Sequence, residues 1–199
     1  GVPSPRQSVK PKMREYERKH PTFALCGLNC GLCPRYHTDG PSRCPGCGGR
    51  DFHLKRPSCS VITCSKKRGN VEFCFQCSDF LCPRYKAPSK RDSFVTYRNV
   101  LSDMDKAKKR GVDRYMRELG RKVKILETLI ARYNDGKRKG FYCLAVNLLD
   151  LADLEKILKR LDGDAGVQKL DIKEKAGAAV ESLEAAAGKK GVELKLRTK

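Results

Sequence analysis

Ten of the eleven cysteines in this 199-residue chain fall within one short segment, between Cys26 and Cys82. Three pairs among them have the spacing Cys-x2-Cys, which lets two sulfurs reach one ion from a single tight turn. Such repeated pairs are typical of metal sites built from thiolates. We therefore predict that ten cysteines are metal ligands: Cys26, Cys30, Cys33, Cys44, Cys47, Cys59, Cys64, Cys74, Cys77 and Cys82.

The spacing alone leaves the kind and number of metal ions open. Thiolates suit both zinc and iron–sulfur clusters, and we favour two or three zinc ions over a 4Fe–4S cluster. Ten thiolates do not divide by four, so a third site would need further ligands. His37 and His53 are candidates, although an exposed loop position is the simpler expectation for both. Cys143 lies in an apolar run and is expected to be a buried thiol.

The strongest single motif is Cys44-Pro-Gly-Cys47-Gly-Gly, which has the form of a zinc knuckle. Glycines after the second cysteine allow positive φ values that direct backbone N–H groups at thiolate sulfur. Cys74 and Cys77 form a weaker copy without the glycines. Because the segment is rich in Gly and Pro, we predict loops, knuckles and small β-hairpins held together by metal.

Disulfides are the alternative use for so many cysteines, and they belong mainly to secreted chains. Residues 1–25 contain no apolar stretch of the kind found in secretory signal peptides. No stretch approaches the roughly 20 apolar residues of a membrane helix. We therefore expect a reducing, cytoplasmic environment.

Apolar residues recur at helical spacing from Asp92 onwards. We predict one helix ending at Gly111, a second from an N-cap at Asp113 to Tyr133, and a third over about 148–161. These amphipathic helices should pack on one another or on the metal segment. Their apolar seams are Phe94, Tyr97, Leu101 and Met104, then Met116, Leu119, Val123, Leu126, Ile130 and Tyr133, then Leu151, Leu154, Leu158 and Leu161.

The C-terminal stretch is predicted to form a strand over Val167–Ile172, a helix over 173–187 and a second strand over Val192–Leu196. The predicted fold class is therefore α+β. It comprises a small cysteine-rich domain of knuckles and short hairpins, an amphipathic helical region and a strand–helix–strand unit. The corresponding segments are a basic flexible arm (1–22), the cysteine-rich domain (23–88), the helical domain (89–163) and the C-terminal extension (164–199).

The formal net charge of +20 is spread along most of the chain, with +4, +6 and +8 in the first three segments and +2 in the last. This distribution favours a long polyanion, and the few aromatic residues favour structured RNA or a ribonucleoprotein over base-by-base reading. A solvated lysine-rich surface is the alternative. The predicted contacts are Lys66, Lys67 and Arg68, and the helix face of Arg114, Arg117, Arg121 and Lys124.

Catalytic motifs are missing from the sequence. It contains no Walker loop, no Gly-x-Gly-x2-Gly, no Ser/His/Asp set and no His-Glu-x2-His. The alternative to a binding module is therefore an iron–sulfur protein acting in electron transfer or metal handling.

Three cysteine motifs together resemble a known family. They are Cys26-Gly-Leu-Asn-Cys30-Gly-Leu-Cys33, Cys44-Pro-Gly-Cys47, and Phe73-Cys-Phe-Gln-Cys-Ser-Asp-Phe-Leu-Cys82. The family is DUF3795, small cysteine-rich proteins of unknown function found largely in anaerobic bacteria and archaea. The run 133–143 with the following leucines resembles its helical tail, so the resemblance spans about 23–161. It implies metal binding and a cytoplasmic location without an established activity, and it leaves residues 1–22 and 164–199 as additions that could carry partner binding.

Overall fold

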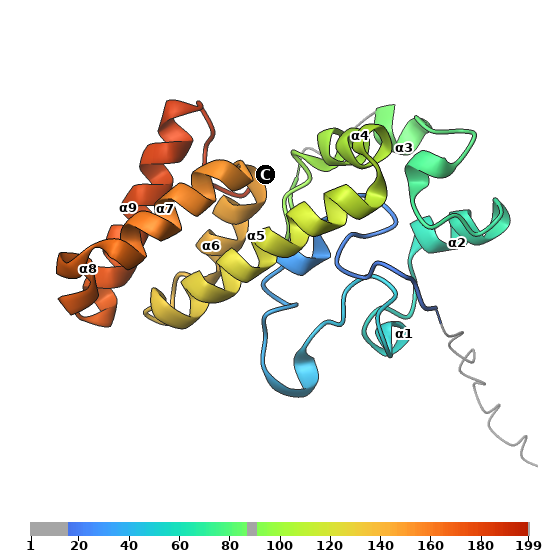
Figure 1. The fold of residues 1–199 in the computed structure, drawn as a ribbon. Helices are drawn as coiled ribbons and strands as arrows, with labels where there is room; N and C mark the ends of the chain where they lie inside the picture. The colour runs from blue at the N-terminus through green and yellow to red at the C-terminus, as the bar shows by residue number, and fades with distance from the viewer. Residues whose placement is uncertain (1–15, 87–90, 199) are drawn as a thin grey trace, which may run out of the picture.

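The computed structural model describes residues 16–86 and 91–198, and the whole of this part is built from helices and loops without a strand. The helix α5 (Val112–Arg132) crosses the middle of the molecule, with the loop-rich residues 16–86 on one side and α6–α9 on the other (Figure 1). The predicted α+β class is therefore wrong. Within the described residues, five helices follow residue 110: α5, α6 (Lys139–Leu148), α7 (Leu151–Gly163), α8 (Ala165–Lys169) and α9 (Ile172–Lys189).

The helix α5 confirms the longest of the predicted helices. Leu119 and Leu126 of its seam are buried, as is Tyr133 at its C-cap. It is separated from α4 (Val100–Arg110) by Gly111, whose φ of 88° favours glycine because a Cβ is strained there. Asp113 lies in the first turn of α5 rather than at its N-cap.

The helix α4 begins later than predicted because Asp92 holds the preceding segment in a loop. The Asp92 carboxylate accepts the backbone N–H of Tyr97 at 2.9 Å and pairs with Arg197 at 2.8 Å. Phe94, the first residue of the predicted seam, is 53% exposed. The helix instead buries Val100, Asp103, Met104 and Ala107.

The helix α6 was not predicted, since a helix that is apolar on all sides shows no amphipathic period. Every residue from Tyr142 to Asn147 is buried. The third predicted helix corresponds to α7, which begins after Asp150 and buries Leu154 and Leu161.

Both predicted C-terminal strands are wrong, because side-chain caps turn the first into helix. Asp164 accepts the N–H groups of Gly166 and Val167 at the start of α8, and Asp171 forms a capping box with Glu174 at the start of α9. The predicted helix over 173–187 lies within α9. Residues 192–196 run without a strand partner, and Arg98 binds the carbonyls of Glu193 and Lys195 at 2.7 and 3.0 Å.

The cysteine-rich segment consists of loops and short helical turns, so the predicted hairpins do not occur in residues 23–86. Residues 1–15 of the predicted arm lie outside the described part of the chain, whereas residues 16–22 pack against this segment. The Cys47 amide, for example, donates to the Pro21 carbonyl at 2.8 Å. The turns are α1 (Phe52–Lys55), α2 (Ser60–Lys67), α3 (Pro83–Lys86), and the 3-10 helices η1 (Cys30–Leu32), η2 (Gly40–Ser42) and η3 (Cys74–Gln76).

A buried polar network fixes the first cysteine loop on the helices. Asn29, between Cys26 and Cys30, donates to Asp103 and to Asn147, both at 2.9 Å, and accepts the Tyr115 hydroxyl at 2.8 Å. Leaving such groups unpaired in the interior costs roughly 1–3 kcal/mol each, so the network specifies one position for the loop.

Apolar packing also joins the two sides of α5. Phe23 and Phe73 of the cysteine-rich segment share one core cluster with Leu126, Leu154 and Leu183 of the helices. The four-segment division stays a prediction. No helix in residues 16–86 and 91–198 is long and apolar enough to cross a bilayer.

Candidate metal centre

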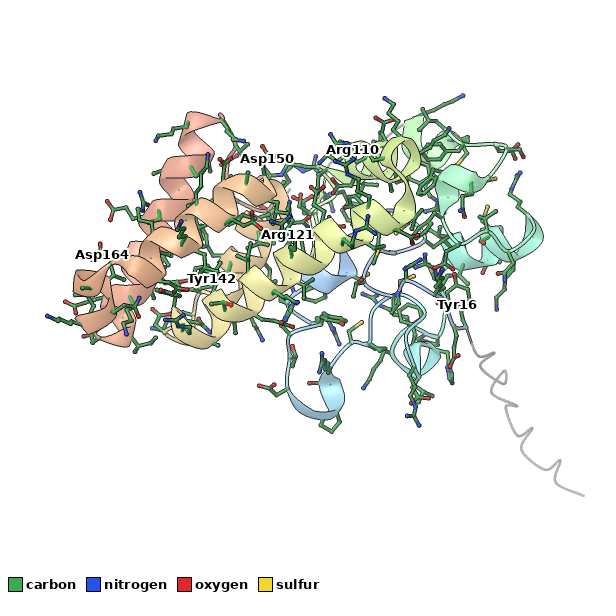
Figure 2. The ribbon with its side chains drawn as sticks, in the orientation of Figure 1. Tyr16, Arg110, Arg121, Tyr142, Asp150 and Asp164 are labelled. Atoms are coloured by element: carbon green, nitrogen blue, oxygen red, sulfur yellow. The ribbon has the colours of Figure 1, made fainter. Side chains whose placement is uncertain are left out.

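Four cysteines lie together beneath the loops of residues 24–62, and we call them the inner set: Cys26, Cys30, Cys47 and Cys59. Cys47 is 8% exposed and belongs to a small apolar cluster with Leu25 and Phe52, and the other three pack on that cluster, as does Cys74 at its edge. Tyr16 covers the same place, with its ring centroid 6.5 Å from that of Phe52 (Tyr16 is labelled in Figure 2). The inner set therefore combines thiols from three separate loops.

Burial and mutual repulsion both disfavour thiolates at the inner set. Burial is the main cause that raises the pKa of Cys26 to about 12, and the neighbouring Cys47, Cys74 and Cys59 thiols raise it further. The pKa of Cys30 is raised for the same reasons, first by burial and then by Cys47 and Cys26. A cation placed among these sulfurs would reverse both penalties, since an opposite charge favours the ionised form.

Four further cysteines line one cavity of about 70 Å³, and we call them the outer set: Cys64, Cys74, Cys77 and Cys82. Cys64 lies on α2, Cys74 begins the turn η3 and Cys77 follows it, and Cys82 precedes α3. A water needs only about 10–15 Å³ of such space, so the cavity has room for an ion.

The outer set differs from the inner set in its exposure and in its polar neighbours. Cys64 is exposed, and Arg68, Asp79 and Arg84 also line the cavity. The Tyr85 hydroxyl hydrogen-bonds the Cys74 thiol, which lowers the pKa of Cys74 against the stronger effect of burial that raises it. The outer set is thus the more solvent-accessible of the two.

Cys33 and Cys44 remain outside both sets, and the Cys33 thiol lies near that of Cys44 and near that of the buried Cys143 on α6. Burial raises the pKa of Cys33, and the Cys44 thiol raises it further. Cys143 is 3% exposed, as expected, and burial followed by the nearby Cys33 raises its pKa to about 12. His37 lies 2.7 Å through Nε2 from the Gly31 carbonyl, so that nitrogen is already engaged.

None of the eleven cysteines, all within the described residues, forms a disulfide. In residues 16–86 and 91–198, no group of three or more His, Cys, Asp or Glu side chains already has the arrangement of a metal site. The thiols of each set share a cavity or an apolar cluster without yet converging on a point. The assignment of the ten cysteines as ligands therefore stays a prediction, and the donor chemistry of two groups of four thiols fits a metal.

Close backbone packing explains the glycines of the knuckle. Gly46 and Gly48 both have positive φ, and a Cβ at Gly46 would lie 2.4 Å from the Pro21 carbonyl oxygen. A Cβ at Gly48 would lie 2.6 Å from Cγ of Arg18. The glycines thus let residues 18–21 approach the Cys47 loop.

Arg18 is a residue of this site that the sequence did not reveal, because its surroundings in sequence resemble a basic arm. Its side chain is only 2% exposed and forms an ion pair with Glu72 at 3.2 Å. Nη1 donates to the carbonyl of Phe23 at 2.9 Å and to that of Cys47 at 3.3 Å. The guanidinium also lies over the Phe73 ring, 5.0 Å from its centroid. Arg18 therefore belongs to the interior of the cysteine-rich segment.

The predicted basic contacts are divided by the structure into free and paired side chains. Arg114, Arg117 and Lys124 are exposed on α5, and no ion pair joins them to the described residues. Arg121, labelled midway along α5 in Figure 2, pairs instead with Glu155 of α7.

In the second predicted group, at the end of α2, two of the three basic side chains interact with other residues. Lys66 lies 5.5 Å from the Tyr16 ring centroid, and Arg68 pairs with Asp79. Lys67 is exposed. The three residues form a helix end rather than the separate loop that the sequence indicated.

Comparison with protein families identifies the cysteine-rich part of the chain. Residues 22–87 match DUF3795, which is described as a protein of unknown function. Comparison with curated proteins and with solved structures found no match. The family match ends before α4, so it does not include the helical tail that the sequence resemblance covered. Residues 22–87, which contain ten of the eleven cysteines, are therefore similar to the DUF3795 family of proteins of unknown function.

Proposed function

We propose that the DUF3795 segment is a metal-binding module in which the inner and outer sets each hold one ion. The observation that carries this proposal is that four cysteines of the outer set line one cavity. The four packed thiols of the inner set support a second site. Metal would supply the cross-links that this segment needs, because it has no sheet in residues 23–86 and only a small apolar cluster of its own.

Zinc is the ion that we favour, in a reducing cytoplasm where thiols stay free for metal. Two four-thiolate groups connected by short turns are typical of structural zinc sites, which are closed and need no open position. An iron–sulfur cluster also takes four thiolates and is the alternative, with a role in electron transfer or metal handling.

Metal analysis of the full chain, purified without oxygen, tests the proposal and separates the two alternatives. We expect a colourless protein with about two zinc ions per chain, one for each four-thiolate set. Iron and sulfide with broad visible absorbance would favour the cluster over zinc. A chain that purifies folded without bound metal, and that takes up none on incubation with zinc or with iron and sulfide, would contradict the proposal.

A second candidate function is the binding of structured RNA, and one observation favours it. Arg114, Arg117 and Lys124 are exposed and unpaired within the described structure, on one long helix of a chain with a net charge of +20. A row of free cations at helical spacing can follow phosphates, which release condensed counterions when they are neutralised.

Reversing these three charges should weaken binding to an RNA hairpin and reduce the salt dependence of its affinity. The variant R114E/R117E/K124E should lower the slope of log K against log salt by about 0.7–0.9 for each phosphate that is no longer neutralised. Fluorescence anisotropy over a salt series measures this slope. Arg121 is left intact because its reversal would also break the pair with Glu155.

The control reverses three exposed lysines on α7 and α9, in the variant K156E/K159E/K173E. It makes the same change in net charge away from the face of Arg114. Equal decreases in affinity in the two variants would show that only the overall charge matters and would contradict a specific α5 surface.

A further inference from the structure

The buried cation Arg18 lies beside the Cys47 loop of the inner cysteine set. Its Nη1 and Nη2 groups are used by backbone carbonyls and by Glu72. One of its hydrogen-bond donors, Nε, is buried and has no acceptor among the described residues. Buried hydrogen-bond donors without an acceptor are uncommon in folded proteins, so we expect an acceptor for Nε.

The Cys47 loop of the inner set is in direct contact with Arg18. Arg18 holds the Cys47 carbonyl at 3.3 Å, and its amide N–H donates to the Gly48 carbonyl at 2.8 Å. Arg18 is therefore fixed to the Cys47 loop by its backbone as well as by its side chain.

Four thiolates around a divalent ion leave a net charge of about −2, which is expensive to keep in a buried place. A neighbouring guanidinium offsets part of that charge and can donate to sulfur. Glu72 does not remove this capacity, because its side chain is 29% exposed and partly hydrated while that of Arg18 is 2% exposed. The ion pair with Glu72 instead orients the guanidinium.

We propose that Arg18 is a positioning residue for metal at the inner set, where it compensates the charge of the thiolates and donates to the sulfur of Cys47. This inference rests on the proposed metal-binding function. It assigns Arg18 to the metal site rather than to a basic arm that contacts a polyanion.

The test compares R18Q with E72Q in the full chain loaded with zinc. Both changes break the same ion pair, so a merely structural role of that pair predicts similar effects. If Arg18 acts through its charge, R18Q should weaken zinc binding at the inner set by roughly 10–100-fold, the range seen for groups that support metal ligands. E72Q should leave it unchanged or tighten it, because it removes a negative charge near the thiolates.

The readout is the chelator concentration at which each cysteine becomes open to alkylation, located by peptide mass spectrometry. In R18Q the inner-set cysteines should react at lower chelator concentration, while those of the outer set should keep the wild-type midpoint. Cobalt provides a second readout, since loss of a donor to Cys47 should move the thiolate-to-cobalt absorption to longer wavelength. R50Q is the matched control, because Arg50 is 93% exposed and lies in the same loop.

R18K keeps the charge without the forked donors and should fall between wild type and R18Q. R18K also takes the place of R18Q in the comparison if R18Q fails to fold. An unchanged inner-set midpoint in R18Q, or in R18K where R18Q cannot be measured, would overturn the inference, and so would equal shifts in R18Q and E72Q. If wild-type cysteines show no metal-dependent protection at all, the proposed function itself fails.

Discussion

Removing bound metal with a chelator should unfold residues 22–86 while most of the helical signal of α5, α7 and α9 remains. A four-thiolate zinc site contributes on the order of 10 kcal/mol of apparent folding free energy, which is as much as a whole small domain usually has. The apolar cluster under the inner set has only six buried residues, so it cannot replace that contribution. The helices contribute most of the larger core cluster, in which Leu126, Leu154 and Leu183 are nearly inaccessible, although Phe23 and Phe73 also belong to it.

Hydrogen exchange followed by mass spectrometry measures this result segment by segment, and far-UV circular dichroism measures the total helix. Peptides from 22–86 should lose protection, and peptides from α5 should lose it where the helix faces that segment, near Tyr115 and Val123. Returning zinc should restore protection, which controls for damage by the chelator. Full protection of residues 22–86 after verified loss of metal would contradict the expectation.

The long helices α5 and α7 could be predicted from the sequence, because a helix that is buried on one face has apolar residues at a regular helical spacing. The seam of α5 and that of α7 are apolar where the core lies, at Leu119, Leu126 and Leu154. The same method failed for α6, which is surrounded by protein on all sides. It also placed a strand where short capped helices occur, since alternation over six residues carries less information than the caps at Asp164 and Asp171.

The sequence yields a list of candidate ligands, which stays a prediction, but not the way in which they are grouped. Cysteine spacing shows which pairs lie on one turn, such as Cys74 and Cys77, yet not which loops meet. Cys59 joins Cys47 only because Phe52, Val61 and Ile62 form one cluster between them. The buried role of Arg18 depends on contacts with residues up to 54 positions away, which no local pattern reveals.

Asn29 is the one residue whose position in the sequence could have indicated that the first cysteine loop packs on the helices. It stands inside the first cysteine motif, where a polar residue with no ligand chemistry needs another explanation. The structure supplies it, since Asn29 bonds to helices more than 70 positions distant. The sequence alone does not indicate that Asp103 and Asn147 are its hydrogen-bond partners.

Substituting one cysteine from each set should remove different ions from the protein. Cys47→Ser should abolish metal at the inner set, and Cys77→Ser should abolish it at the outer set, because serine is a poor ligand where thiolate is required. Each change should lower the metal content by about one ion and forfeit a large part of the roughly 10 kcal/mol that a structural site provides. The double variant should bind no metal at either set.

Cys143→Ser is the matched control, because Cys143 is as buried as Cys47 but stands on α6 outside both sets. It should keep the full metal content, and native mass spectrometry can count the ions in every variant. Cys33→Ser and Cys44→Ser extend the test, since two sites of four leave these residues out. Loss of an ion in either would reveal a third site that includes them. If Cys47→Ser and Cys77→Ser instead lost the same single ion, the division into two sets would be contradicted. The two cysteines would then bind one shared ion.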